Sequence, residues 1–275
     1  MDEEQWRQME FPEAEALVLY FTAENGYCIP TFLGTMKKLK ILIINNHSAR
    51  RATLSGLNSF EKLSQLKTLQ LERLRVPPPD RYFNCPKNLV KLSLSLCEGL
   101  GDMVRLDKDN FFNFPGLLEF NADHCSDLEE LPRGICSSNS LKLLLVRNCH
   151  QLSKLPDELG RLRLLEVLSL CACASLEVLP QSILNLQKLE ILDVSHCVNL
   201  KVFPDRFHEL SSLKQLDMGE CRKLPQFCGS LPRLRSLNHV ICSEKNEQQL
   251  KRLRNVSFNV EVVEEQFGLD WLYDR

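Results

Sequence analysis

The chain has 275 residues, a formal net charge of −2, 44% hydrophobic residues and 12 cysteines. This near-neutral balance argues against nucleic acid as a partner and against direct contact with an anionic membrane surface. No stretch approaches the roughly 20 apolar residues of a membrane-spanning helix. The acidic first residues do not resemble a secretory signal.

In the first part of the chain, short apolar runs predict strands at uneven intervals. Loose copies of one leucine pattern begin at Ala14, Leu39, Leu66 and Leu89. The segments that separate these strands are irregular in length and composition. Loss of regularity toward the ends is expected of a repeat array, because terminal repeats act as caps.

The centre of the chain contains four in-phase copies of a 24-residue phrase, which begin at Leu117, Leu141, Leu165 and Leu189. The template L-x-x-L-x-L-x-x-C-x-x-L-x-x-L-P is typical of a leucine-rich repeat in which Cys fills the position that Asn often holds. One repeat cannot bury its apolar face alone, so neighbouring repeats must stack. The sequence therefore predicts an α/β leucine-rich-repeat solenoid: a curved parallel β-sheet with short helices or 3₁₀ turns and loops on the convex side.

Alternation along each strand predicts which side chains face the core. Leu192 and Val194 are expected inside, whereas Ile191, Asp193 and Ser195 are expected on the concave face of the sheet. After each LP step, apolar residues three positions apart predict a 3₁₀ turn on the convex side. The preceding prolines suit this place because they have no ladder hydrogen bond to lose there.

Toward the C-terminus, two further repeats are predicted to begin at Leu213 and Leu234. The second start lies 21 residues after the first and places Cys242 in the template position of the central cysteines. A degenerate last strand is expected from Leu253 onward, with Val256, Phe258 and Val260 as its apolar positions.

The expected organisation is an N-terminal capping repeat over 1–38, leucine-rich repeats over 39–252 and a C-terminal cap and tail over 253–275. Two interpretations of the aromatic tail stay open. Trp271 covers the exposed end of the solenoid, or it anchors a partner, since Trp is enriched at interface hot spots.

Six of the 12 cysteines occupy one template position, and a position filled on every turn is a packing position rather than part of a disulfide framework. These residues are Cys97, Cys125, Cys149, Cys173, Cys197 and Cys221. Reduced, buried thiols imply a reducing compartment, so the expected location is cytoplasmic or nuclear.

Catalytic and metal-binding motifs are not found, which favours a non-enzymatic chain. The sequence has no glycine-rich phosphate loop, no H-E-x-x-H and no paired C-x-x-C, so neither a cofactor nor a metal is expected. Cys171 and Cys173 form a C-x-C but are predicted to face opposite sides of their strand. Ser195 and His196 with nearby acids are better interpreted as a polar binding surface than as a hydrolytic triad, because His196 is expected to point away from Ser195.

The concave face is the candidate binding surface. Carboxylates recur over its C-terminal half without compensating bases, and a strip of apolar side chains crosses its middle. Exposed apolar residues flanked by polar ones mark protein interfaces. The predicted partner-binding residues are Glu119, Asp123, Leu143, Leu145, Arg147, Val167, Ile191, Asp193, His196, Gln215, Asp217 and Glu220, which is expected beside His196, together with Trp271 in the tail.

Several motifs carry a family resemblance. They are MEFPEAEALVLYF near the N-terminus, LDVSHCVNL at 192–200, the repeated LP steps, HVIC at 239–242 and the terminal FGLDWL. Together they resemble the C-terminal leucine-rich-repeat domain of plant helper NLR immune receptors, the coiled-coil class related to broad-spectrum powdery-mildew resistance proteins. The terminal tail is the most specific motif, since the central repeats resemble those of many plant NLRs.

The resemblance implies a role downstream of sensor receptors. In that family the repeat domain docks onto heterodimers of lipase-like immune proteins that have bound a small nucleotide-derived signal. The chain is then expected to signal in innate immunity and cell death, or to compete for the same partner if it is a truncated relative. The alternative is an intramolecular autoinhibitory module that restrains the receptor's own nucleotide-binding domain.

Overall fold

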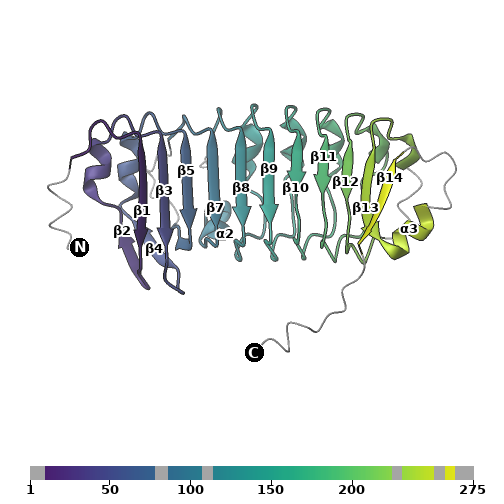
Figure 1. The fold of residues 1–275 in the computed structure, drawn as a ribbon, viewed down its shortest axis with the longest axis horizontal. Coiled ribbons are helices and arrows are strands. Elements are labelled where there is room, and N and C mark those ends of the chain that lie inside the picture. Colours follow the sequence, from purple (N-terminus) through teal and green to yellow (C-terminus); the bar gives the residue numbers. More distant parts are fainter. Residues whose placement is uncertain (1–9, 78–85, 107–113, 225–230, 251–257, 264–275) are drawn as a thin grey trace.

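The computed structural model describes residues 10–77, 86–106, 114–224, 231–250 and 258–263. In the described part of the chain, eleven parallel strands stand side by side in one elongated sheet, with short helical segments behind them (Figure 1). In order, they are β1 Ala16–Phe21, β3 Ile41–Asn46, β5 Thr68–Glu72, β7 Lys91–Ser95, β8 Glu119–Asp123, β9 Leu143–Arg147, β10 Val167–Ser169, β11 Ile191–Asp193, β12 Gln215–Asp217, β13 His239–Ser243 and β14 Asn259–Val263. The predicted leucine-rich-repeat solenoid is confirmed.

The strands pair without any shift of the repeat, and this register builds the core. Leu144 pairs with Leu168, Leu168 with Leu192 and Leu192 with Leu216. All four side chains are fully buried. Burial of each leucine stabilises the fold by roughly 1.5–3 kcal/mol, so identical positions in successive repeats supply one continuous core.

The return arms run on the other side of the sheet and contain 3₁₀ helices, as the three-residue spacing predicts. Pro132, Pro156 and Pro180 each stand just before such a helix with extended backbone, where a proline loses no hydrogen bond. Gly160 allows neighbouring arms to touch, because a Cβ there would lie 2.4 Å from the Ser182 carbonyl oxygen. The 3₁₀ helices are η1 Thr31–Thr35, η2 Leu57–Lys62, η3 Arg133–Ser137, η4 Asp157–Arg161, η5 Gln181–Asn185, η6 Phe207–Glu209 and η8 Leu231–Arg233.

The irregular N-terminal segments form structure that the repeat template does not predict. A second parallel sheet joins β2 Gly26–Cys28, β4 Ala52–Ser55 and β6 Leu74–Arg75. A short helix, α2 Leu100–Leu106, takes up extra residues in the longest repeat, and α3 Glu244–Leu250 follows β13 (Figure 1). Within the described ranges, no helix is both long and apolar enough to cross a membrane.

In the repeats of β5 to β12, one residue per repeat adopts a left-handed backbone where the strand ends, although none of these residues is glycine. The series is Arg73, Leu96, His124, Asn148, Ala172, His196 and Glu220. A positive φ is unfavourable for residues with a Cβ. The turns from Arg73 to His196 are tied to the next repeat: the His196 N–H, for example, donates to the Gly219 carbonyl at 2.7 Å.

The template cysteine follows this left-handed residue and turns into the core. All six template cysteines are buried, which confirms the predicted packing role. Each thiol also donates to a backbone carbonyl of the preceding repeat, as Cys197 does to Leu170 at 3.1 Å and Cys221 to Val194 at 3.0 Å. An Asn side chain is also a donor, which explains why these two residue types share this position in such repeats.

The predicted phase of the last two strands is wrong. Leu216 pairs with Val240, so the repeat begins at Leu237, 24 residues after Leu213 rather than 21. Cys242 consequently lies on the strand β13, at the repeat position that Met218 holds just after β12, and not in the position of Cys221. The predicted start, Leu234, belongs to the return arm. It was mistaken for a strand position because Leu231, Leu234 and Leu237 are all buried and three residues apart.

The last strand exists, but its inward residues also differ from those expected. Val240 pairs with Val260 and Cys242 pairs with Val262. Phe258 is buried just before β14 begins, whereas the sequence pattern placed it within the strand. Cross-strand pairing, rather than apolar spacing alone, decides this register.

Replacement of Leu192 by Asp should lower the free energy of unfolding by about 4 kcal/mol or more, because it buries an unpaired carboxylate between two leucines. Thermal melting by circular dichroism measures the effect. Val202→Asp is the matched control, since this valine is 52% exposed, and it should stay within about 0.5 kcal/mol of wild type. Equal melting of both variants and wild type would contradict the register.

Burial raises the pKa of Cys97 and Cys197 to about 12 from an ordinary value of 9.0. These thiols therefore hold roughly 10³-fold less thiolate than an ordinary cysteine at neutral pH. In the native protein, iodoacetamide should alkylate both at least about 10²-fold more slowly than the exposed Cys28. Peptide mass spectrometry over time measures the rates, with the guanidinium-unfolded chain as control, in which the rates should converge. Equal native rates would contradict the packing role.

Candidate protein-binding face

Side chains of successive repeats align in ladders on the concave face, which is the sheet surface opposite the buried leucines. One ladder runs through Glu119, Leu143, Val167, Ile191, Gln215 and His239. The next runs through Asn121, Leu145, Ser169, Asp193, Asp217 and Ile241. Asp123 and Arg147 pair one step further along β8 and β9.

Four predicted apolar residues gather in the middle of this face. Leu143 pairs with Val167, Val167 pairs with Ile191, and Leu145 lies two residues after Leu143 on β9. We call these four residues the apolar patch. All four are half-buried rather than fully exposed.

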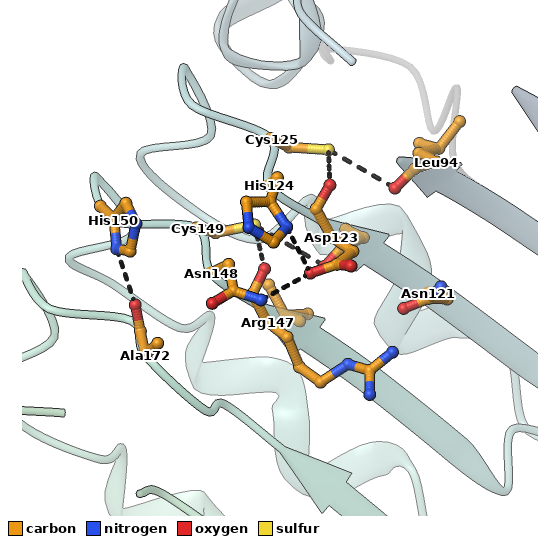
Figure 2. Close-up of polar contacts among 12 residues, drawn as sticks. Leu94, Asn121, Asp123, His124, Cys125, Arg147, Asn148, Cys149, His150 and Ala172 are labelled. Atoms are coloured by element: carbon orange, nitrogen blue, oxygen red, sulfur yellow. Dashed lines mark hydrogen bonds and ion pairs between the residues drawn. The ribbon is translucent and has the colours of Figure 1, made fainter. Parts of the chain in front are cut away.

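On the N-terminal side of the apolar patch, the predicted acidic residues already have partners. Glu119 forms an ion pair with Lys91 at 2.7 Å. The Oδ1 atom of Asp123 lies 3.0 Å from His124 Nδ1 and accepts a hydrogen bond from Asn148 Nδ2 at 2.9 Å (Figure 2). Glu119 is therefore neutralised by a base, and Asp123 is held at the strand exit by hydrogen bonds.

Arg147 follows the apolar patch at the end of β9. Its guanidinium extends away from Asp123 in Figure 2, and no ion pair involves it among the described residues. Its Nε atom is shielded from solvent and has no hydrogen-bond partner in the described part of the chain. The sequence predicted the position of this cation but not that it would lack an ion-pair partner and an acceptor for Nε.

On the C-terminal side, Asp193 is oriented by hydroxyl groups. Its carboxylate accepts hydrogen bonds from Ser169 Oγ at 2.7 Å and from Ser195 Oγ at 2.6 Å. The Ser195 N–H donates to it at 3.0 Å. No ion pair joins it to a basic side chain within the described ranges. Asp193 therefore presents negative charge to the concave face.

Asp217 pairs directly with Asp193 on the neighbouring strand. Burial raises the pKa of the Asp217 carboxyl above its ordinary value, and repulsion from Asp193 and Glu261 adds to this shift. The hydrogen bond from the Gly219 N–H, at 2.9 Å, and the nearby His196 act in the opposite direction. Two adjacent carboxylates of this kind favour a cation on this part of the face.

Three residues beyond Asp217 were not predicted as site residues. Ile241 pairs with Asp217, while His239 Nε2 lies 3.2 Å from Glu261 Oε2. They were missed because the last repeats were placed in the wrong phase. The 24-residue interval from Leu213 to Leu237 was the signal that would have located them.

The strand-exit residues differ from the prediction in one respect. His196 is exposed as expected, but Glu220 is buried, with an 8% exposed fraction. Its carboxylate turns to Arg222, at 3.1 Å, and so Glu220 does not belong to the binding face. Ser195 is also buried, because its hydroxyl is directed to Asp193 rather than outward.

The same geometry bears on catalysis and metal binding. The Ser195 hydroxyl donates to Asp193, and among the described residues no hydrogen bond links it to His196, so a serine–histidine pair is not assembled. Cys171 is half-buried on the concave face while Cys173 is fully buried. The described ranges hold no group of three or more side chains suited to a metal ion. The remaining predicted residue, Trp271, lies outside the described residues.

A second apolar cluster lies at the N-terminal end of the concave face. Val18 and Tyr20 on β1 and Ile41 on β3 are 42%, 65% and 41% exposed. The Tyr20 ring packs against His47, with ring centroids 5.2 Å apart. Apolar residues at outward strand positions were the available signal, although the candidate set did not include them.

Comparison with solved structures supports the fold. The leucine-rich repeat domain of the type III effector XopL aligns with a TM-score of 0.63 and 22% sequence identity, over 95% of this chain and 79% of that domain. At this level of identity the likeness concerns the fold alone. No protein-family model matches the chain.

Half of the chain is homologous to plant disease resistance proteins of the helper NLR class, which confirms the resemblance inferred from the motifs. The probable disease resistance protein At4g33300 of Arabidopsis thaliana is 40% identical over 144 residues, which are 52% of this chain and 18% of that protein. The disease resistance protein ADR1 of the same plant is 39% identical over 145 residues, with the same coverage. The match thus spans less than a fifth of the length of these relatives. Fold and relatives together point to a non-enzymatic immune recognition domain.

Replacement of Asp217 by Asn should stabilise the protein at pH 7 by a few tenths of a kcal/mol, since the raised pKa means that the ionised form is disfavoured in the folded state. The gain should shrink as the pH falls through the raised pKa and vanish below the ordinary pKa of 3.8, where the wild-type carboxyl is protonated in both the folded and the unfolded state. Melting temperatures at pH 7 and about pH 3 measure this difference. Asp205→Asn, at an exposed position of a return arm, is the control and should show no comparable gain.

Proposed function

We propose that this chain is the recognition part of a plant helper NLR and that it docks onto a lipase-like immune heterodimer through the C-terminal half of its concave face. The observation that carries the proposal is the juxtaposition of the apolar patch with Asp193 and Asp217, two carboxylates without a basic partner in the described chain. Apolar area supplies affinity, and uncompensated charge supplies orientation and association rate. The heterodimer itself is suggested by the family resemblance.

The proposed binding set changes in the light of the side-chain positions. The apolar patch, Arg147, Asp193, Gln215 and Asp217 remain, while Glu220 is removed because it is buried. His196 stays at the rim of the face, and Glu119 and Asp123 act as paired side chains at its N-terminal border. Ile241 and Glu261 extend the face toward its C-terminal end. The proposed site of action is the cytoplasm or the nucleus.

A second candidate function is intramolecular autoinhibition. The match covers less than a fifth of each of the first two relatives, and the occupant of the face in this candidate is the nucleotide-binding domain of such a protein. The exposed cluster of Val18, Tyr20 and Ile41 favours this candidate, because it offers a separate apolar surface at the other end of the face.

Charge reversal tests the leading proposal. Asp193→Lys/Asp217→Lys should bind a purified, signal-loaded lipase-like heterodimer at least about tenfold more weakly than wild type, mainly through a slower association rate. The loss should shrink at high salt, because salt screens exposed charges. Biolayer interferometry at two salt concentrations measures both rates.

Asp157→Lys/Asp205→Lys is the matched control, with two exposed return-arm carboxylates reversed, and it should bind as wild type. Ile191→Glu tests the apolar patch separately and should also weaken binding. Circular dichroism verifies that each variant is folded. Undiminished binding by both concave variants would refute the proposed face, and binding of a relative's nucleotide-binding domain in place of the heterodimer would favour autoinhibition.

A further inference from the structure

Arg147 is a cation at the border of the apolar patch that no carboxylate neutralises within the described chain. Several exposed charges are paired between neighbouring repeats, as in Lys91–Glu119 at 2.7 Å and Lys142–Glu166 at 2.8 Å. Arg147 forms no such pair, and its Nε–H is shielded from water without an acceptor. A shielded donor of this kind favours a ligand that brings an acceptor to it.

The neighbouring carboxylate is not available to Arg147. Asp123 stands directly across from it in the strand register. However, Asp123 Oδ1 is engaged by His124, at 3.0 Å, and by Asn148, at 2.9 Å, which hold it toward the strand exit. Figure 2 shows the guanidinium extending in another direction, away from the Asp123 carboxylate. The fold therefore keeps the nearest anion away from this cation.

The surroundings of Arg147 define what kind of group fits there. Leu145 lies two residues before Arg147 on β9 and is half-buried, so it offers an apolar surface on one side. On the neighbouring strand, Asn121 donates to Ser93 Oγ at 3.1 Å, and its Oδ1 atom is shielded and lacks a donor in the described chain. The face thus offers an unused donor and an unused acceptor beside an apolar surface, which matches a peptide segment.

We infer that Arg147 receives the carboxylate of an Asp or Glu side chain of the partner, next to an apolar side chain that packs on Leu145. This inference rests on the proposed function of the concave face as a protein-binding surface. The planar guanidinium matches a carboxylate with two parallel hydrogen bonds. One cation close to Asp123 suits a single negative charge better than the higher charge of a phosphate group.

The partner segment is therefore expected to carry both signs of charge. Its acidic side chain meets Arg147, its apolar side chain meets the apolar patch, and a basic side chain meets Asp193 and Asp217 further along the face. This order gives the segment a direction across the strands, because reversal would bring like charges together.

Side-chain NMR of the whole chain tests the inference without the heterodimer. The probes are the blocked dipeptides acetyl-Leu-Glu-amide, acetyl-Leu-Gln-amide and acetyl-Gly-Glu-amide, with inorganic phosphate as a fourth ligand. The Nε–Hε resonance of Arg147, assigned by its loss in Arg147→Gln, should shift and saturate with the Leu-Glu peptide. Half-saturation should need roughly three- to tenfold less of this peptide than of the two others, since it alone combines charge and apolar contact.

Variants complete the test, with the methyl resonances of Leu145 as the readout. Arg147→Gln should remove the preference for Glu over Gln, and Arg147→Lys should retain part of it, because the charge remains without the planar fork. Arg163→Gln, at an exposed return-arm arginine, should leave the preference unchanged. Equal binding of the Glu and Gln peptides, tighter binding of phosphate, or the same loss in both Gln variants would overturn the inference. A chain that shows the preference but fails to bind the heterodimer would contradict only the proposed partner.

Discussion

The parallel register of the inward side chains is the constraint on which the rest of the structure depends. Leu144, Leu168, Leu192 and Leu216 stack without a shift, and each is sealed by its neighbours. Since side chains alternate along a strand, this register also determines which residues form the concave face. A slip of one residue would exchange the core for the binding surface, so fold and candidate function share one geometric requirement.

The strand exit shows how the repeat satisfies its backbone without glycine. A left-handed residue such as His196 turns the chain, and its N–H is accepted by the next repeat. The following cysteine, Cys197, fills the core and donates to a carbonyl of the preceding repeat. The local strain is thereby offset by contacts that exist only when repeats stack, which makes the array cooperative.

The concave face combines satisfied and unsatisfied charge in one surface. Hydroxyl and amide donors orient Asp193 and Asp123. By contrast, the Arg147 Nε–H has no acceptor in the described chain, and burial and neighbouring carboxylates disfavour the ionised form of Asp217. An open solenoid offers such groups to a macromolecule rather than to an enclosed substrate. This is the physical basis for interpreting the face as a recognition surface and not as a catalytic centre.

The 24-residue period determined, by itself, the repeat fold, the buried cysteines and the concave position of residues such as Leu143 and Asp193, because periodicity alone assigns side chains to faces. The tertiary structure alone decided the phase of β13, the burial of Glu220 and the isolation of Arg147. These features depend on which neighbour pairs with a strand or a charge. A one-dimensional pattern places a side chain on a face, but its partners come from other repeats. Only packing in three dimensions therefore determines whether a charged side chain has an ion-pair or hydrogen-bond partner.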